Sequence, residues 1–287
     1  MIEYTEEKNK GGKMKRIKSF ILYLFITVTI FAQEAYISSF NTLRLGKNKK
    51  DYELTAKILS NFDLIGLIEV MNEEGIENLV EELESVTHTK WAYHISAYPV
   101  GKSNYKEYFA YVWKKNRVKF LKSRGYYPDR NKVFSRQPYG ADFKVDNIDF
   151  TMVLAHSVFG KSEKERRAEA FKMGNVYDYF QNLDKKENDI IIAGDFNLSA
   201  LDEAFEGFLK HKDKITYTID PKIKTTLGEN KLASSYDNMF ISKIYTKEFK
   251  GKSGALDFSK SNYKVMRRKV SDHLPIFIIL NSGTDDD

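Results

Sequence analysis

Hydrophobic and polar positions alternate in short runs along the chain from about residue 35, and their period changes repeatedly between that of a strand and that of a helix. Residues 51–62, the segment around residues 76–83 and the long segment 162–183 repeat apolar residues at helical spacing. Asp146 and Asn147 separate two apolar runs by the two residues of a tight hairpin turn. The predicted strands are residues 35–41, 64–70, 91–96, 108–114, 118–126, 141–145, 148–155, 189–193, 236–242 and 274–280.

This order of elements predicts a fold class. Strands and helices alternate at the beginning of the chain, whereas the middle holds consecutive strands that we expect to pair antiparallel. An α/β (α+β) architecture follows, with two packed, mainly antiparallel sheets flanked by helices in a four-layer α/β/β/α sandwich. No internal repeat, linker or low-complexity tract interrupts residues 33–287, so we expect them to form a single domain.

The N-terminal residues have the pattern of an export signal. Basic residues 13–18 precede an apolar run, residues 20–31, and the small residue Ala32 follows. The run is short for a membrane span, which needs about 20 apolar residues. We predict a signal peptide over residues 14–32, a polar extension over 1–13, and secretion to the extracellular or periplasmic space; a single membrane anchor is the alternative.

Composition narrows the function classes only a little. The 46 Lys and Arg residues exceed the 40 Asp and Glu residues, for a formal charge of +6, which suits an anionic substrate without indicating a histone-like polycation. The absence of cysteine excludes a disulfide partner, a thiolate nucleophile and a Cys-ligated zinc. Complete phosphate-loop and dinucleotide motifs are absent as well, so no nucleotide cofactor is predicted.

Polar residues recur at the ends of the apolar strands. They are Asn41, Glu69, His156, Asp195, Asn197, Asp237, Asp272 and His273. A carboxylate that follows several buried residues is costly to bury unless it is paired or bound to a cation. The oxygen ligands suit Mg²⁺, Mn²⁺ or Ca²⁺, and the two histidines have the ordinary pKa that proton transfer near neutral pH requires.

Each of these residues also has a structural explanation. Glu69 alone could stabilise the N-terminus of the following helix, and Asp195 with Asn197 could form only a turn. His156 could be a core histidine, and Asp272 could lie in a solvated loop. Their recurrence at equivalent positions favours one shared site.

The set resembles the endonuclease/exonuclease/phosphatase superfamily, and within it the secreted deoxyribonuclease I group, over residues 37–280. Two segments carry the more specific part of the likeness. Residues 101–107 resemble the family segment with a groove-reading tyrosine and an acid that partners a catalytic histidine. Residues 134–138, Phe-Ser-Arg-Gln-Pro, resemble a family stretch whose arginine contacts phosphate.

The resemblance implies a role for each matched residue. The catalytic residues would be His156 with Glu107 and His273 with Asp237. The metal and phosphate environment would be Glu69, Asn41, Asp195, Asn197 and Asp272. The substrate-binding residues would be Arg136, Tyr105 and Arg44. In the family an arginine that enters the minor groove stands where this chain has Met71.

The expected function is therefore a secreted, Mg²⁺- or Mn²⁺-dependent endonuclease. It would act as a monomer and hydrolyse DNA phosphodiester bonds to 5′-phosphate products with low sequence specificity, by a two-histidine acid/base mechanism. Structural Ca²⁺ and RNA as a second substrate stay open. The alternatives are a superfamily phosphodiesterase acting on sphingomyelin or phosphoinositide, against which Tyr105 and Arg136 argue, and a nuclease-like toxin or binding subunit.

Overall fold

The computed structural model describes residues 33–102, 105–160, 162–184 and 186–285. The chain divides into two units, Met1–Phe31 and Ala32–Asp287, and the elements below all belong to the second unit. The predicted polar extension and signal peptide lie outside the described residues. Within those residues, no helix has the length and apolar character that a membrane crossing requires.

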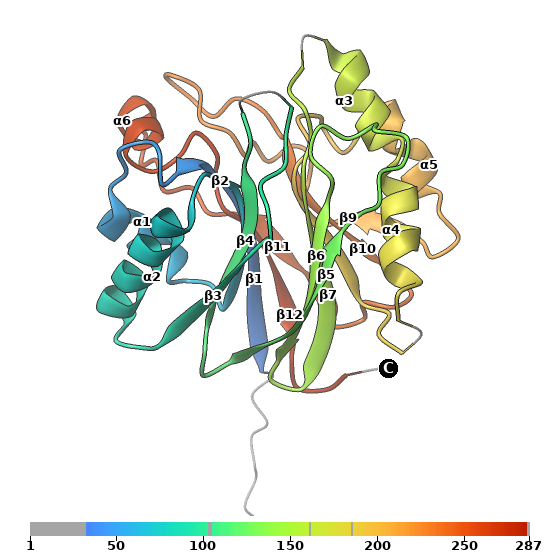
Figure 1. Cartoon of the computed structure of the whole chain (residues 1–287), viewed down its shortest axis with the longest axis horizontal. Helices are drawn as coiled ribbons and strands as arrows, with labels where there is room; N and C mark the ends of the chain where they lie inside the picture. Colours follow the sequence, from blue (N-terminus) through green and yellow to red (C-terminus); the bar gives the residue numbers. More distant parts are fainter. Residues whose placement is uncertain (1–32, 103–104, 161, 185, 286–287) are drawn as a thin grey trace, which may run out of the picture. The chain divides into compact units, whose positions relative to one another are not determined.

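Two six-stranded sheets form the centre of this unit (Figure 1). The first sheet has the order β11 (Phe249–Ala255), β12 (Ile276–Asn281), β1 (Glu34–Leu45), β2 (Leu64–Val70), β4 (Tyr108–Lys114) and β3 (Trp91–Ile95). The second has the order β5 (Val118–Tyr126), β6 (Tyr139–Val145), β7 (Ile148–His156), β8 (Ile190–Asp195), β10 (Asp237–Ser242) and β9 (Ile215–Tyr217). The β1–β2 and β7–β8 pairs are parallel, and the other pairs are antiparallel.

Helices cover the outer face of each sheet. Helices α1 (Tyr52–Leu59) and α2 (Glu73–Thr87) lie on one side, and α4 (Met173–Gln181) and α5 (Glu206–Leu209) on the other, while α6 (Tyr263–Lys269) and α3 (Glu163–Ala170) lie near the upper edge (Figure 1). A short 3₁₀ helix, Glu203–Phe205, precedes α5. The layers confirm the predicted four-layer sandwich.

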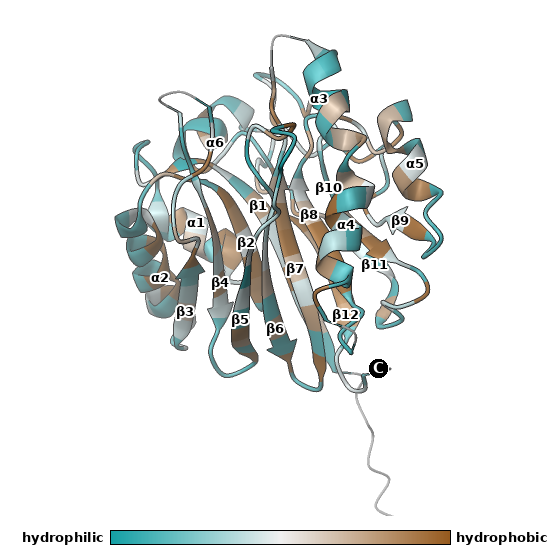
Figure 2. Cartoon of the chain, turned by 45° about the vertical axis from the view of Figure 1, so that its right-hand side comes forward, coloured by the Kyte–Doolittle hydropathy of each residue, from teal (hydrophilic) through white to brown (hydrophobic). Residues whose placement is uncertain are grey.

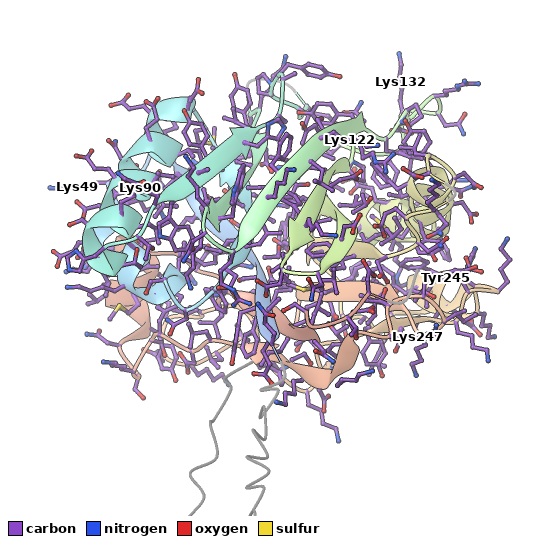
Figure 3. All side chains as sticks on the ribbon, turned by 90° about the horizontal axis from the view of Figure 1, so that it is seen from below. Lys49, Lys90, Lys122, Lys132, Tyr245 and Lys247 are labelled. Carbon is purple, nitrogen blue, oxygen red and sulfur yellow. The ribbon has the colours of Figure 1, made fainter. Side chains whose placement is uncertain are left out.

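The apolar runs of the central strands follow from burial on both faces. In β2, Leu64 and Ile68 pack in the core between the sheets, whereas Ile65 and Leu67 pack in the core under α1 and α2. Successive side chains of a strand point to opposite faces, so a strand between two cores is apolar throughout. Figure 2 shows this as brown strands beside helices whose outer faces are largely teal. Lys49 and Lys122, both labelled in Figure 3, lie at separate places on the surface.

The prediction of one long helix over residues 162–183 is wrong. The chain forms two helices there, α3 and α4, with Phe171 and Lys172 between them. The Lys172 N–H donates to the Glu169 carbonyl three residues back, which tightens the chain at the break. The buried stripe of α4 begins only at Met173, and α3 is mostly charged, so one continuous apolar face did not exist.

The middle strands also differ in part from the expectation. Strands β6 and β7 form the predicted hairpin, with Asp146 at φ 54° in its turn. Strands β4 and β5 do not pair, because the chain passes from the first sheet to the second between them. Strands β9 and β11 were not predicted; β11 is largely polar and glycine-containing, so it carries no apolar signal.

Candidate active site

The strand-end residues converge where the two sheets meet at one edge. Asn41 and Glu69 come from the neighbouring parallel strands β1 and β2 of the first sheet. His156 and Asp195 end the parallel strands β7 and β8 of the second sheet, where they are register partners. Asp195 is also the register partner of Asp237 on β10. The strand ends lie at the upper edge in Figure 1, so strand register alone places three of the predicted residues side by side.

His156 is held by a buried carboxylate. Its Nδ1 atom lies 2.6 Å from Glu107 Oε1, and Glu107 is fully buried at the start of β4. Arg136 Nε lies 2.9 Å from the other oxygen of Glu107. Burial by itself would raise the pKa of Glu107, but the charges of His156 and Arg136 hold it below its ordinary value. Burial and Arg136 act to lower the pKa of His156, and Glu107 outweighs them and raises it.

His273 has an equivalent partner in Asp237. Its Nδ1 atom lies 2.8 Å from Asp237 Oδ2, and that oxygen also accepts a hydrogen bond of 2.6 Å from the Thr225 hydroxyl. Burial favours a lower pKa for His273, but the charges of Asp237 and Asp195 outweigh it and raise the pKa above its ordinary value. Each histidine therefore presents its Nε2 atom to the site with its Nδ1 atom fixed by a carboxylate.

Both free Nε2 atoms approach one oxygen. Asp195 Oδ2 lies 3.7 Å from His156 Nε2 and 3.5 Å from His273 Nε2. The Asn41 amide donates to this same oxygen at 3.3 Å and to Glu69 Oε1 at 3.1 Å. Two carboxylates from different sheets thus share one amide, with a histidine on either side.

The donor set fits a hard divalent cation. Glu69 and Asp195 bring two negative charges to a largely dehydrated place, an arrangement that a bound cation stabilises. Asp195, Asp237 and His273 also offer ligand atoms within 4.8 Å of one another. Asp237 and His273 already hydrogen-bond to each other, so Glu69 and Asp195, with Asn41 beside them, are the residues that could hold a cation.

Asn197 and Asp272 stand at the edge of this group. The Asn197 N–H donates to Asp195 Oδ1 at 2.9 Å, and its side-chain amide donates to the Ser157 carbonyl at 2.8 Å. Asp272 is partly exposed and lies 3.6 Å from Arg267 Nη2. Both residues line the same pocket as the histidines, and the distances place neither one between Glu69 and Asp195.

Tyr105 links Arg44 and Arg136 to Glu69. Its hydroxyl donates to Glu69 Oε2 at 2.7 Å. Its ring lies under the guanidinium groups of Arg44, at 4.8 Å, and Arg136, at 5.6 Å. Burial raises the pKa of Tyr105 above its ordinary value, so the phenol stays a donor. The structure thus brings these three predicted residues together beside Glu69.

The backbone at the site is unusual. Glu69 has φ 59° and Asn197 has φ 52°, a region that costs side chains energy. The alternative that Glu69 serves the following helix is not what the structure shows, because Asn72 caps α2 by accepting from the Gly75 N–H. Strain at Glu69 instead serves to aim its carboxylate between the sheets.

A pocket of about 310 Å³ opens over these groups. Both histidines, Glu69 and Asp195 line it, and Arg267 and Phe159 stand at its sides. Larger hollows, of about 590, 710 and 760 Å³, lie against α4, between α1 and α6, and beside the turn between β6 and β7. None of these three has a histidine in its lining, so the smaller pocket is the candidate active site.

Several residues of the site escaped the sequence analysis. Thr225 holds Asp237 from a loop twelve residues earlier, and Glu169 holds two loops beside the pocket. Nothing in their sequence neighbourhood marks them. Phe159 could have been noticed as a large apolar residue three positions after His156 and outside any predicted strand.

Comparisons with known proteins agree with this geometry. No protein-family profile matches the chain. It is 26% identical to a deoxyribonuclease from Thioalkalivibrio over 92% of this chain and 76% of that protein. It is 28% identical to mouse deoxyribonuclease gamma over 91% of this chain and 89% of that protein.

Solved structures agree on the fold. An endonuclease/exonuclease/phosphatase family protein from Bacteroides thetaiotaomicron matches with a TM-score of 0.62 and 17% identity, over 86% of this chain and 97% of that one. A protein of the same family from Leptotrichia buccalis gives 0.59 and 20%, over 85% and 98%. The chain therefore has the endonuclease/exonuclease/phosphatase fold. Its curated relatives are deoxyribonuclease I-like proteins, which confirms the resemblance and the prediction of a deoxyribonuclease I-like enzyme.

Proposed function

We propose that this protein is an exported, divalent-metal-dependent endonuclease that hydrolyses DNA phosphodiester bonds to 5′-phosphate products. The observation that carries the proposal is the pair of carboxylate-held histidines whose Nε2 atoms both lie within 4 Å of Asp195 Oδ2. Phosphodiester hydrolysis needs one group that takes a proton and one that gives a proton, on opposite sides of the phosphorus.

The two histidines would divide this work. One imidazole accepts a proton from water at Nε2 as the water oxygen forms its bond to phosphorus. The other donates the proton on its Nε2 to the 3′ oxygen as the phosphorus–oxygen bond breaks. Glu107 and Asp237 fix the two rings through Nδ1 and stabilise the imidazolium that each ring passes through.

Glu69 and Asp195, with Asn41, would hold Mg²⁺ or Mn²⁺. When bound, the cation supplies positive charge against the phosphoryl oxygens, where negative charge grows during hydrolysis. Asn197 and Asp272 would complete the phosphate environment at the pocket wall. Arg136 and Arg44 add positive charge beside Tyr105.

DNA is the substrate that the curated relatives' names support. The charged and polar groups of the pocket recognise the phosphate, which every nucleotide carries, so low sequence specificity follows. Met71, in place of a groove-binding arginine, removes one cation that could have contacted bases. Export through the N-terminal signal and action as a monomer are part of the same proposal.

The test is nicking of supercoiled plasmid by the full chain, with Mg²⁺ or Mn²⁺ and with a chelator. We expect metal-dependent nicking that falls by about 100-fold or more in His156→Ala and in His273→Ala, because a positioned acid or base contributes about 10²–10⁴-fold. His211→Ala is the matched control, since His211 pairs with Asp178 away from the pocket. A ligase should seal the nicks without prior phosphorylation, because the proposed cut leaves a 5′-phosphate.

Two results would contradict the proposal. Full activity in either active-site histidine variant would remove the two-histidine mechanism. The second result concerns the substrate. If folded wild-type protein nicks no DNA with either metal, with or without Ca²⁺, but releases phosphocholine from sphingomyelin or phosphate from phosphoinositide, the substrate of the same site is a lipid.

A further inference from the structure

Phe159 is an exposed aromatic residue at the wall of the catalytic pocket. It lines the pocket with His156 and Asn197, yet 61% of it is exposed to solvent. Single exposed apolar side chains are common on protein surfaces, so the place of Phe159 at the pocket wall, and not its exposure alone, points to contact with a ligand. The acid/base and metal chemistry proposed above makes no use of this ring.

The two residues that precede Phe159 are held by hydrogen bonds to the rest of the fold. The Ser157 N–H donates to the Asp195 carbonyl at 2.8 Å, and the Asn197 amide donates to the Ser157 carbonyl at 2.8 Å. The Val158 N–H donates to Glu169 Oε2 at 2.9 Å. The exposure of Phe159 is therefore a fixed feature of the loop.

Glu169 is a positioning residue for this loop. It is almost fully buried, and its other oxygen accepts a hydrogen bond of 2.7 Å from the Ser135 N–H, next to Arg136. Burial raises the pKa of Glu169, so the fold holds a costly carboxyl group between the loop of Phe159 and the loop of Arg136. One side chain thereby links the residue before Phe159 to the residue before Arg136.

The ring itself is supported by a guanidinium group. Arg166 Cζ lies 4.4 Å from the centroid of the Phe159 ring. Arg166 Nε donates to the Phe159 carbonyl at 2.7 Å, and Nη1 donates to the Asn197 carbonyl at 3.2 Å. A cation over one face of an aromatic ring holds it in place and leaves the rest of the ring free for contact.

We propose that Phe159 is a stacking subsite for the nucleobase next to the scissile phosphate. The proposal rests on the proposed nuclease function and adds a substrate preference to it. A base can stack flat on the ring only when it is unpaired, at a strand end or in a single strand. The protein should therefore favour single-stranded or frayed DNA over a fully paired duplex, because each stacked base gains contact that paired bases cannot make.

The experiment compares two single-stranded oligonucleotides of equal length in the full-length protein. One carries natural bases, and the other has abasic tetrahydrofuran residues on both sides of one cleavable phosphodiester. Phe159→Ala should raise KM for the natural strand by about 5- to 100-fold, the effect of removing one stacking aromatic, with kcat within about 2-fold. The same variant should leave KM for the abasic strand within about 2-fold of wild type. Phe159→Trp should restore the affinity for the natural strand.

Phe171→Ala is the matched control. Phe171 is a phenylalanine with the same 61% exposure, and it lies between α3 and α4 and does not line the pocket. It should change neither KM. If Phe159→Ala raises KM equally for both strands, the ring only shapes the loop. If it raises KM for neither strand, no base contacts the ring. Either result overturns the subsite. Wild type that nicks plasmid but cuts neither single strand would overturn the single-strand preference, whereas wild type that cuts neither plasmid nor single strands would overturn the proposed function.

Discussion

The two active-site carboxylates that hold histidines differ in their surroundings. Glu107 has Arg136 as a second partner, whereas Asp237 has the neutral hydroxyl of Thr225. Arg136 opposes the effect of Glu107 on the pKa of His156, whereas Asp237 and Asp195 both act to raise the pKa of His273. The two histidines are therefore chemically distinct although their hydrogen bonds are alike, as a pair with one proton acceptor and one proton donor requires.

The substitution Asp237→Asn, which replaces one carboxylate oxygen by an amide nitrogen, tests whether Asp237 orients His273. The amide keeps the shape of the side chain but favours a different tautomer of His273, so we expect kcat to fall by about 10²–10⁴-fold with little change in melting temperature. The measurement is plasmid nicking under saturating metal, beside thermal unfolding. Asp213→Asn is the control, because Asp213 is a buried carboxylate beside His211, outside the site. Equal kcat values in the two variants would contradict an orienting role for Asp237.

At the scale of the element, the parallel pair of β7 and β8 depends on one glycine. Gly194 has φ 150°, and a Cβ atom there would lie 1.8 Å from the Ala155 carbonyl oxygen. The close approach of the two backbones at this point is what sets Asp195 beside His156. The glycine is thus required by packing, next to the residue on which the site is centred.

Gly194→Ala should destabilise the protein severely. Because the added methyl group would overlap backbone, which cannot rotate away, we expect the free energy of unfolding to fall by more than about 3 kcal/mol. Chemical denaturation measures it. Gly207→Ala, in α5 with no atom within 4 Å of the added group, should instead be neutral or stabilising by up to about 1 kcal/mol. A Gly194→Ala protein as stable as wild type would contradict the geometry.

A second prediction at this scale concerns His94 on β3. The ring stacks 4.6 Å from Phe120, its Nε2 atom lies 2.7 Å from the Tyr139 hydroxyl, and burial lowers its pKa. Since the folded state then binds a proton less readily than the unfolded state, stability falls as pH drops from the ordinary histidine pKa through the folded one. His94→Gln should lose less stability than wild type between about pH 7 and pH 5.

Urea denaturation at several pH values checks this, and the quantity to compare is the slope of stability against pH. His88→Asn, at the exposed end of α2, is the control and should keep the wild-type slope. If His94→Gln has that slope as well, the acid sensitivity comes from other groups.

At the scale of the whole molecule, the proposed cation site joins the two sheets. Glu69 comes from the first sheet and Asp195 from the second, and the Asn41 amide donates to both carboxylates. A cation that binds both should stabilise the folded state as a unit, because a ligand that binds only the folded state adds its binding free energy to folding.

Mg²⁺ or Mn²⁺ at 100 times its Kd should therefore stabilise the protein by about 2.7 kcal/mol, or about 5–10 °C in melting temperature. A chelator should reverse the shift, and Glu69→Gln should abolish it. The exposed Glu74→Gln should keep it. A full shift in Glu69→Gln would place the cation elsewhere, for example at Asp189, Glu248 and Asp285, whose ligand atoms also lie within 4.8 Å of one another.

The sequence by itself determined the element types and much of the list of site residues. Apolar runs such as β2 mark strands buried on both faces, and a polar residue at the end of such a run is marked by its cost of burial. The helix break at Phe171 was missed because helical spacing in α4 masked the absence of an apolar face in α3. The polar strand β11 was missed because a strand shows an apolar pattern only where its side chains are buried.

Only the tertiary structure decided which residues meet and how. The contact of Asn41 with Asp195 spans 154 residues, and that of Thr225 with Asp237 comes from an irregular loop. Strand register and backbone closeness fix such contacts, and neither is written in local periodicity. The same holds for Glu169 and Phe159, since a buried carboxylate and an exposed ring are recognised only once the surface exists. The residue types therefore indicated the chemistry of the site, whereas the fold determined the position, the burial and the direction of each side chain.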